Sequence, residues 1–132
     1  MTRTWHVVHR TDDGERVGWL RPVDGGLVVP MTLAGTPAGG PSSVEHATAL
    51  LTAGGLALLA RRWWCRLPEP MPPGVTHVDD PHPGWAWRPT LLVEVSPEQV
   101  RLRPEVPAPE ERTALGVLPF PAGGLLRSEP PG

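Results

Sequence analysis

The sequence predicts an α+β fold in which two short helices pack on one face of a three-stranded antiparallel meander, with a C-terminal β-hairpin and proline-rich irregular segments. Three observations predict this fold. β-rich runs alternate with Asp-Gly turns over residues 4–34, a helical pattern follows over 42–63, and a second pair of β-rich runs flanks a four-residue turn at 96–99. A chain of 132 residues suits one domain, which we place at residues 1–104.

The meander is predicted from hairpin turns at residues 12–14 and 24–26, each of which ends in glycine. Three-residue loops predict the following cross-strand pairs on one face: Val7–Trp19, Trp19–Met31, His9–Val17 and Val17–Leu33. We expect the helices to cover this face, so Trp19 is predicted to belong to the core. Pro30 cannot donate to a ladder, which predicts that the third strand is an edge strand.

The helical pattern begins at Ser-Ser-Val-Glu, residues 42–45. This tetrapeptide predicts a capping box in which the Ser42 hydroxyl accepts from the third helical amide. The helical spacing of apolar residues is interrupted by the two glycines at residues 54–55. It begins again with the apolar positions Leu56, Leu59, Ala60 and Trp63. Two short helices separated by a glycine cap are therefore predicted, with Trp63 and Trp64 pointing in different directions at the second helix end.

The second half of the chain is rich in proline. Residues 68–84 are predicted to form a long irregular loop, and residues 105–132 a Pro/Gly-rich, largely irregular tail. Between them, residues 87–103 form the predicted hairpin. Its four-residue turn predicts the following pairs, which match apolar with apolar and acid with base: Val95–Val100, Glu94–Arg101 and Val93–Leu102.

Charge and composition exclude several classes of protein. The net charge is −2, which differs from the basic footprint of a protein that coats nucleic acid. Lysine is absent, so a phosphate loop of the Gly-Lys-Ser/Thr type cannot form, and the choice of amino acids is typical of a GC-rich bacterial genome. The single cysteine excludes a disulfide scaffold, and no apolar run could span a bilayer. We therefore expect a cytoplasmic protein.

Tryptophan supplies the candidate interaction residues, because the chain contains six tryptophans and one phenylalanine. Trp85 and Trp87 alternate at the start of the predicted hairpin, so both rings should lie on one side. Such a pair can line a groove, since indole rings dominate binding hot spots. It can also cover the end of a small sheet, and the large area of an aromatic ring favours this core interpretation. Trp64 is the third candidate.

Candidate metal ligands lie in the proline-flanked loop: His77, Asp79 and His82. Two imidazoles and a carboxylate can bind a divalent metal, but their spacing matches no known signature. Exposed loop residues are the favoured interpretation, and no cofactor is expected. Cys65 is interpreted as a small buried apolar side chain rather than a nucleophile.

Three function classes remain open. A small non-enzymatic module that binds another protein is favoured, because no complete catalytic constellation is present. The first alternative is a nucleic-acid-binding domain whose three-stranded sheet presents Arg3, Arg10, Arg16 and Arg21; neighbouring acidic residues argue against it. The second alternative is a metal-assisted enzyme that uses the loop from His77 to His82.

Overall fold

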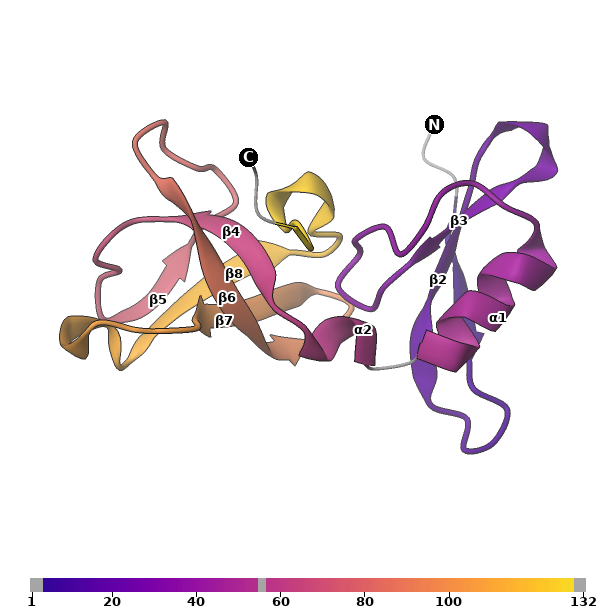
Figure 1. Ribbon diagram of the computed structural model, residues 1–132, viewed down its shortest axis with the longest axis horizontal. Coiled ribbons are helices and arrows are strands. Elements are labelled where there is room, and N and C mark those ends of the chain that lie inside the picture. The colour runs from indigo at the N-terminus through magenta and orange to yellow at the C-terminus, as the bar shows by residue number, and fades with distance from the viewer. Residues whose placement is uncertain (1–3, 55–56, 130–132) are drawn as a thin grey trace. The chain divides into compact units, whose positions relative to one another are not determined.

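The computed structural model describes residues 4–54 and 57–129, and the chain divides into two compact units, Met1–Leu59 (unit 1) and Ala60–Gly132 (unit 2) (Figure 1). Unit 1 contains a three-stranded sheet in the order β1-β2-β3, and unit 2 a five-stranded sheet in the order β4-β6-β7-β8-β5. The mixed α+β class predicted from the sequence is confirmed. The elements are β1 (His6–His9), β2 (Arg16–Pro22), β3 (Val28–Met31), α1 (Val44–Gly54), α2 (Ala57–Ala60), β4 (Trp63–Leu67), β5 (Gly74–His77), β6 (Ala86–Val95), β7 (Gln99–Pro104) and β8 (Ala114–Pro119), with 3₁₀ turns at Asp24–Gly26, Pro109–Glu111 and Gly123–Leu125.

The sheet of unit 1 is the predicted antiparallel meander, with β3 at an edge. Trp19 pairs with Val7 and with Met31, as the turns predicted. The expected pair of His9 with Val17 is wrong, because a bulge shifts the register and His9 pairs with Arg16. The expected pair of Val17 with Leu33 is also wrong, since β3 ends at Met31. The bulge leaves Val17 as the extra residue, which is 1% exposed.

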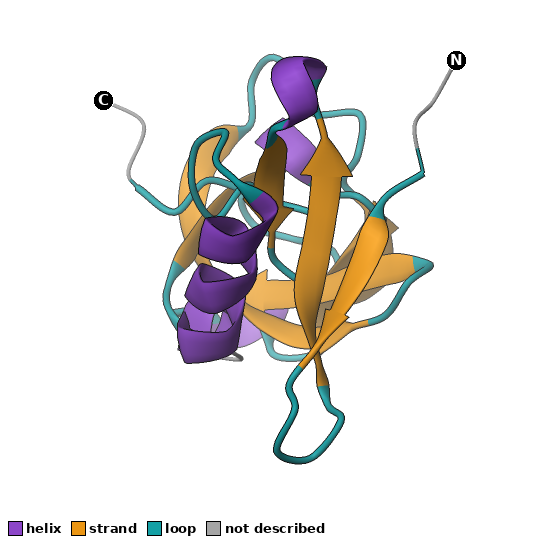
Figure 2. Ribbon diagram, turned by 90° about the vertical axis from the view of Figure 1, so that its right-hand side faces the viewer, coloured by secondary structure: helices purple, strands orange, loops and turns teal. Residues whose placement is uncertain are grey.

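The helix covers the face opposite to the one that the sequence suggested. α1 packs along the sheet of unit 1 (Figure 2), and the cluster that it buries contains Val8, Val17, Leu20, Val28, Ala47 and Leu51. Val8 pairs with Gly18, whereas Trp19 lies next along β2 and therefore points to the other face. Trp19 is only partly buried. Its assignment to the helix-covered core is wrong because the helix needs a close approach, and glycine, not tryptophan, permits one.

Gly18 is the position that permits this approach. A Cβ atom placed there would collide with the backbone oxygen of Met31 on β3 and would lie 2.9 Å from Leu51 Cδ2. We therefore expect Gly18→Ala to lower the free energy of unfolding by about 1–3 kcal/mol, as overpacking of a filled core does. Urea unfolding followed by circular dichroism measures the change. Gly40→Ala is the control, since nothing lies within 4 Å of a Cβ at that position; equal stability of the two variants would contradict the packing argument.

The start of α1 also differs from the prediction. The His46 amide donates to Ser43 Oγ at 3.1 Å, so Ser43 is the capping residue. Ser42 was expected in that role, but its backbone bridges to Val28 of β3 and its hydroxyl has no hydrogen-bond partner among the described residues. The predicted glycine break falls partly on residues 55–56, which lie outside the described residues. The chain then forms only one turn, α2, and Trp63 begins a strand rather than continuing a helix.

The segments predicted to be irregular contain two strands of unit 2. β5 lies within the proline-rich loop 68–84, and β8 lies within the 105–132 tail. β8 pairs antiparallel with β7 and parallel with β5, so it occupies an interior position of the sheet. The sequence placed one domain at residues 1–104 and a tail after it, whereas the contacts divide the chain into two units between residues 59 and 60. The second unit instead extends through the tail, because the apolar run at residues 114–118 completes its sheet.

β6 and β7 pair with a register close to the expected one. Glu94 pairs with Arg101 and Val95 with Val100, whereas a bulge displaces Val93 so that Leu92 pairs with Leu102. The strand side chains that form the core of unit 2 include Trp63, Cys65, Leu67, Val100, Leu102 and Leu118, all at most 1% exposed. This inner face fixes which side chains of β4 and β6 point outward.

Candidate functional site

The three candidate tryptophans all lie in unit 2. Trp64 is on β4 and Trp87 on β6, and Trp85 comes just before β6. Arg66 pairs with Trp87 and Trp64 pairs with Pro89, and residues paired across antiparallel strands project to the same side. Their strand neighbours Trp63, Cys65 and Leu67 are buried on the opposite side. We call the outward group Trp64, Arg66, Trp87 and Pro89 the tryptophan face. All four side chains are partly buried.

Two arginines contact this surface, one through the backbone of a neighbouring turn and one through an indole ring. Arg66 donates to the backbone oxygens of residues 82, 83 and 85, at 3.2–3.3 Å. These bonds fix the turn that carries Trp85. The Arg127 guanidinium carbon lies 4.6 Å from the centroid of the Trp87 ring, within the range of a cation–π contact. Trp64 and Arg127 also exchange two backbone hydrogen bonds, of 2.7 and 2.9 Å, which bring the C-terminal segment to the edge of β4.

Cys65 is a core residue, as the sequence predicted. Its side chain points to the inner face of the sheet, and the residue is 1% exposed. Burial raises the pKa of its thiol to about 12. A thiol with this pKa is almost fully protonated at neutral pH, which favours a packing role for Cys65.

The burial of Cys65 leads to a test of native packing. We expect the folded protein at pH 8 to leave the thiol unreacted with a disulfide reagent such as dithionitrobenzoate, and the protein in guanidinium chloride to react at one equivalent, because only the exposed thiolate attacks. Absorbance of the released thiolate measures both. Rapid labelling of the native protein would show that Cys65 is accessible.

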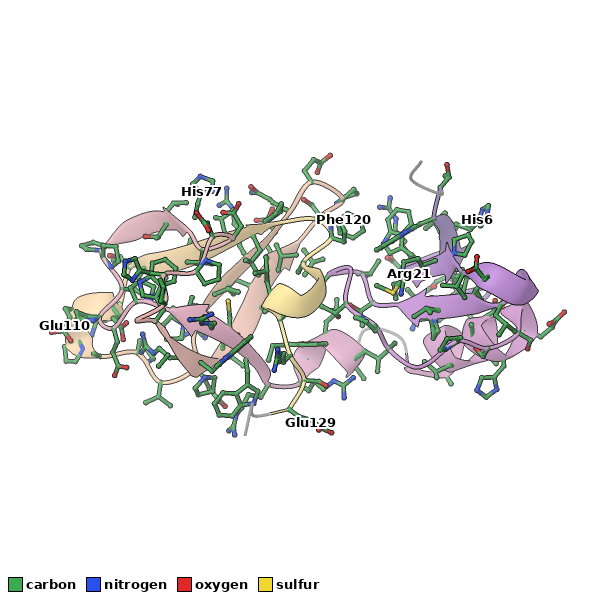
Figure 3. The ribbon with its side chains drawn as sticks, turned by 90° about the horizontal axis from the view of Figure 1, so that it is seen from above. His6, Arg21, His77, Glu110, Phe120 and Glu129 are labelled. Carbon is green, nitrogen blue, oxygen red and sulfur yellow. The ribbon has the colours of Figure 1, made fainter. Side chains whose placement is uncertain are left out.

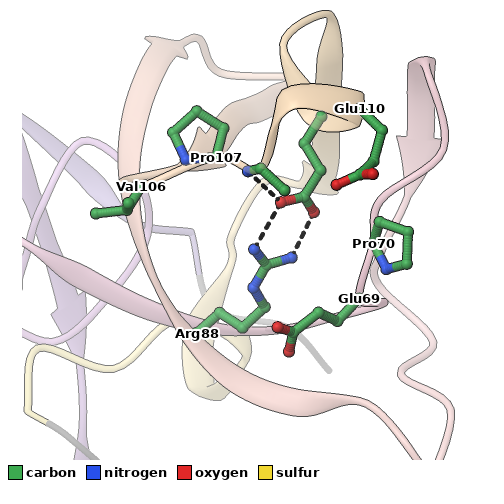
Figure 4. Close-up of a pocket in the computed structure, with 8 residues that line it drawn as sticks. Glu69, Pro70, Arg88, Val106, Pro107 and Glu110 are labelled. Carbon is green, nitrogen blue, oxygen red and sulfur yellow. Dashed lines mark hydrogen bonds and ion pairs between the residues drawn. The ribbon is translucent and has the colours of Figure 1, made fainter.

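Two adjoining depressions lie beside the 67–70 segment, with volumes of about 310 and 370 Å³. They share Glu69 and Pro70. The first depression is drawn in Figure 4, where Glu110, Pro107 and Val106 form its other walls. The second reaches Trp85 and His82, next to the tryptophan face. Both depressions are open rather than enclosed, and the carboxylates of Glu69 and Glu110 give the first an acidic rim.

Arg88 and Glu111 form a buried ion pair at the first depression (Figure 4). The two guanidinium nitrogens of Arg88 lie 2.7 and 2.8 Å from the two carboxylate oxygens. The amides of Met71 and Ala108 also donate to this carboxylate, at 2.7 and 3.0 Å. Arg88 is the main reason why the pKa of Glu111 falls to about 2, and burial opposes the shift. The carboxylate is therefore fully bonded and stays ionised, which suits a structural role.

The candidate metal ligands are not brought together. Among residues 4–54 and 57–129, no group of three or more His, Cys, Asp or Glu side chains has an arrangement that could hold a metal ion. His77 ends β5 at the surface (Figure 3), and Asp79 and His82 are also exposed. His82 Nδ1 instead accepts a hydrogen bond from the Gly84 amide at 3.4 Å.

Two arginines of the meander, Arg10 and Arg16, make contacts within unit 1. Arg10 donates to both carboxylate oxygens of Asp13 at 2.6 and 3.1 Å, and this contact is the main reason why the pKa of Asp13 falls to about 2. The Arg16 guanidinium carbon lies 5.9 Å from the Trp19 ring centroid. Arg21 is partly buried (Figure 3), and Arg3 lies outside the described residues. These contacts do not favour phosphate binding by this sheet.

Sequence reasoning missed the arginines of the candidate surface. Arg66 could have been found, because Trp64 and Arg66 alternate and a strand places them on one side. The contact of Arg127 with Trp87 joins residues 40 positions apart through a single backbone bridge, and no local pattern predicts it. The pair of Arg88 with Glu111 has the same non-local origin.

Comparison of the chain with family models, curated proteins and solved structures finds no significant match. Within the described residues, no helix is long and apolar enough to cross a membrane. The function must therefore be argued from the surface itself.

Proposed function

We propose that this protein is a small non-enzymatic interaction module that binds another protein through the tryptophan face of unit 2. The observation that carries the proposal is the partial exposure of Trp64 and Trp87 on the outer side of β4 and β6, opposite the fully buried inner side of β4. Tryptophan and arginine are the residues most enriched in binding hot spots. Here both kinds lie on one rigid pair of strands, which lowers the entropy that binding costs.

The two buried groups with shifted pKa values support a non-catalytic function. A general acid or base works best with a pKa near the operating pH. The pKa of Cys65 is raised to about 12 and that of Glu111 is lowered to about 2, so both move away from the neutral range. The cytoplasmic location expected from the sequence remains part of this proposal.

Comparative capture tests the proposal. Immobilised wild-type protein and a Trp87→Leu variant are incubated with nuclease-treated lysate of a GC-rich bacterial host, and retained proteins are quantified by mass spectrometry. We expect at least one protein to be retained by the wild type and lost from the variant, because the flat indole that anchors the contact is gone.

Val106→Ser is the matched control, since Val106 is 79% exposed and lies outside the tryptophan face. This control should retain the same proteins as the wild type. Identical capture by all three baits would contradict the assignment of the tryptophan face as the binding surface.

A further inference from the structure

Charge is segregated in unit 2. Acidic residues slightly outnumber arginines over residues 60–132. Glu94 is nevertheless the only acidic residue within the five described strands of the sheet, and it pairs with Arg101. The other acidic residues of the unit lie outside these strands. The outer side of the sheet is therefore locally basic in a unit that is slightly acidic.

Two arginines on this side remain available to a ligand. The Arg66 guanidinium already donates hydrogen bonds to three backbone oxygens, so it is less available to a ligand. Arg103 pairs with Leu91 on the outer side, because Leu91 lies two residues beyond Pro89 on β6. Arg103 and Arg127 are both exposed, and neither forms an ion pair with another described residue. They are the exposed cations of this surface.

The position of Arg127 suits it to a carboxylate. Its guanidinium carbon lies 4.6 Å from the Trp87 ring centroid, so a cation–π contact with the indole holds the guanidinium in place. A guanidinium supported in this way loses little further freedom when it binds, and its planar fork of N–H donors matches a carboxylate in bidentate geometry. The partly exposed rings of Trp64 and Trp87 offer apolar area beside it.

We propose that the partner contributes a short acidic segment in extended conformation, whose carboxylates bind Arg127 and Arg103 while its apolar side chains cover Trp64 and Trp87. This inference rests on the proposed function and names the chemistry of the partner. Single-stranded nucleic acid is disfavoured, because it needs a groove with many cations along the backbone. Among the described residues, this surface has two exposed arginines without ion pairs, which are too few to neutralise the successive phosphates of a strand.

Selection from a random decapeptide phage library tests the inference. Wild-type protein serves as the bait, and competition between soluble selected peptides maps whether they share one site. We expect enrichment of Asp and Glu between apolar residues. Arg127→Gln should weaken the selected peptides about tenfold or more, as the loss of a hydrogen bond to a charged group does. The variant keeps the backbone bridge to Trp64, and its unfolding curve checks that the fold persists.

Arg112→Gln is the matched control, because Arg112 is exposed and lies outside the strands. It should bind the selected peptides as the wild type does. Two results together would overturn this inference and leave the proposed function standing. The selected peptides would contain no acidic residues, and they would still lose affinity on Trp87→Leu. An oligodeoxythymidine probe that binds with sensitivity to Arg127→Gln, in the absence of any selected peptide, would overturn both, as would failure of all probes.

Discussion

Ending the chain after Pro104 should abolish the cooperative unfolding of unit 2. The deletion removes β8, whose neighbours β7 and β5 would then lose their ladder partner. It also removes residues of the core: Ala114, Val117, Leu118, Ala122 and Leu126, each at most 5% exposed. Arg88 would lose the carboxylate of Glu111 and remain a partly buried, unpaired charge. Each of these losses costs several kcal/mol, which is comparable to the whole stability of a small domain.

Tryptophan fluorescence in a urea titration measures this effect when Trp5 and Trp19 of unit 1 are replaced by phenylalanine in both chains, because the other four tryptophans, Trp63, Trp64, Trp85 and Trp87, all lie in unit 2. The shortened chain should show no unfolding transition from these residues. A chain that ends after Glu129 is the control, since it retains every described residue of the unit. A transition of unchanged midpoint in the shortened chain would show that β8 is dispensable.

The tail illustrates why local patterns failed in the second half of the chain. β8 is short and flanked by prolines, and its parallel partner β5 begins 40 residues earlier, at the pair Gly74–Ala114. Neither strand has a hairpin turn that would reveal the pairing. The apolar run at residues 115–120 is compatible with a strand, but the high proline content of the segment favours an irregular tail. Parallel pairing across a long connection is decided by tertiary packing.

The first half of the chain was more predictable because its contacts are local. Glycine-ended turns fixed the pairs of Trp19 with Val7 and Met31. The covered face depended on a non-local fit, in which Leu51 of α1 approaches Gly18 of β2. A glycine in a strand often marks such an approach, and this signal was present in the sequence. At the candidate site, the tryptophans were identifiable from the sequence, whereas Arg127 was positioned by a distant backbone bridge.

Replacing Glu111 by glutamine should lower the free energy of unfolding by about 3–5 kcal/mol at neutral pH, because it leaves Arg88 without a charged partner in a buried position. Urea unfolding at pH 7 measures the loss. Asp13→Asn is the matched control: it also removes a carboxylate that an arginine binds with two hydrogen bonds, but this pair is exposed to solvent. Because water screens this exposed pair, we expect Asp13→Asn to change the free energy of unfolding much less than Glu111→Gln does.

The same ion pair should set much of the acid stability. The pKa of Glu111 falls from an ordinary value of 4.5 to about 2 in the folded protein. A carboxyl with a lowered folded pKa stabilises the protein above its unfolded pKa, and this stability is lost as the pH falls toward the folded value. The wild type should therefore lose about 3 kcal/mol between pH 5 and pH 2 through this group. The Glu111→Gln variant should lack that part of the decline.

Replacing both partners separates the charge from the rest of the network. Arg88→Met combined with Glu111→Leu should be more stable than Glu111→Gln alone, because no unpaired buried charge remains. Recovery should stay incomplete, since the amides of Met71 and Ala108 lose the carboxylate that accepts their hydrogen bonds. A double variant as unstable as the single one would show that those amide bonds, rather than the ion pair, hold the 69–71 and 108–111 segments together.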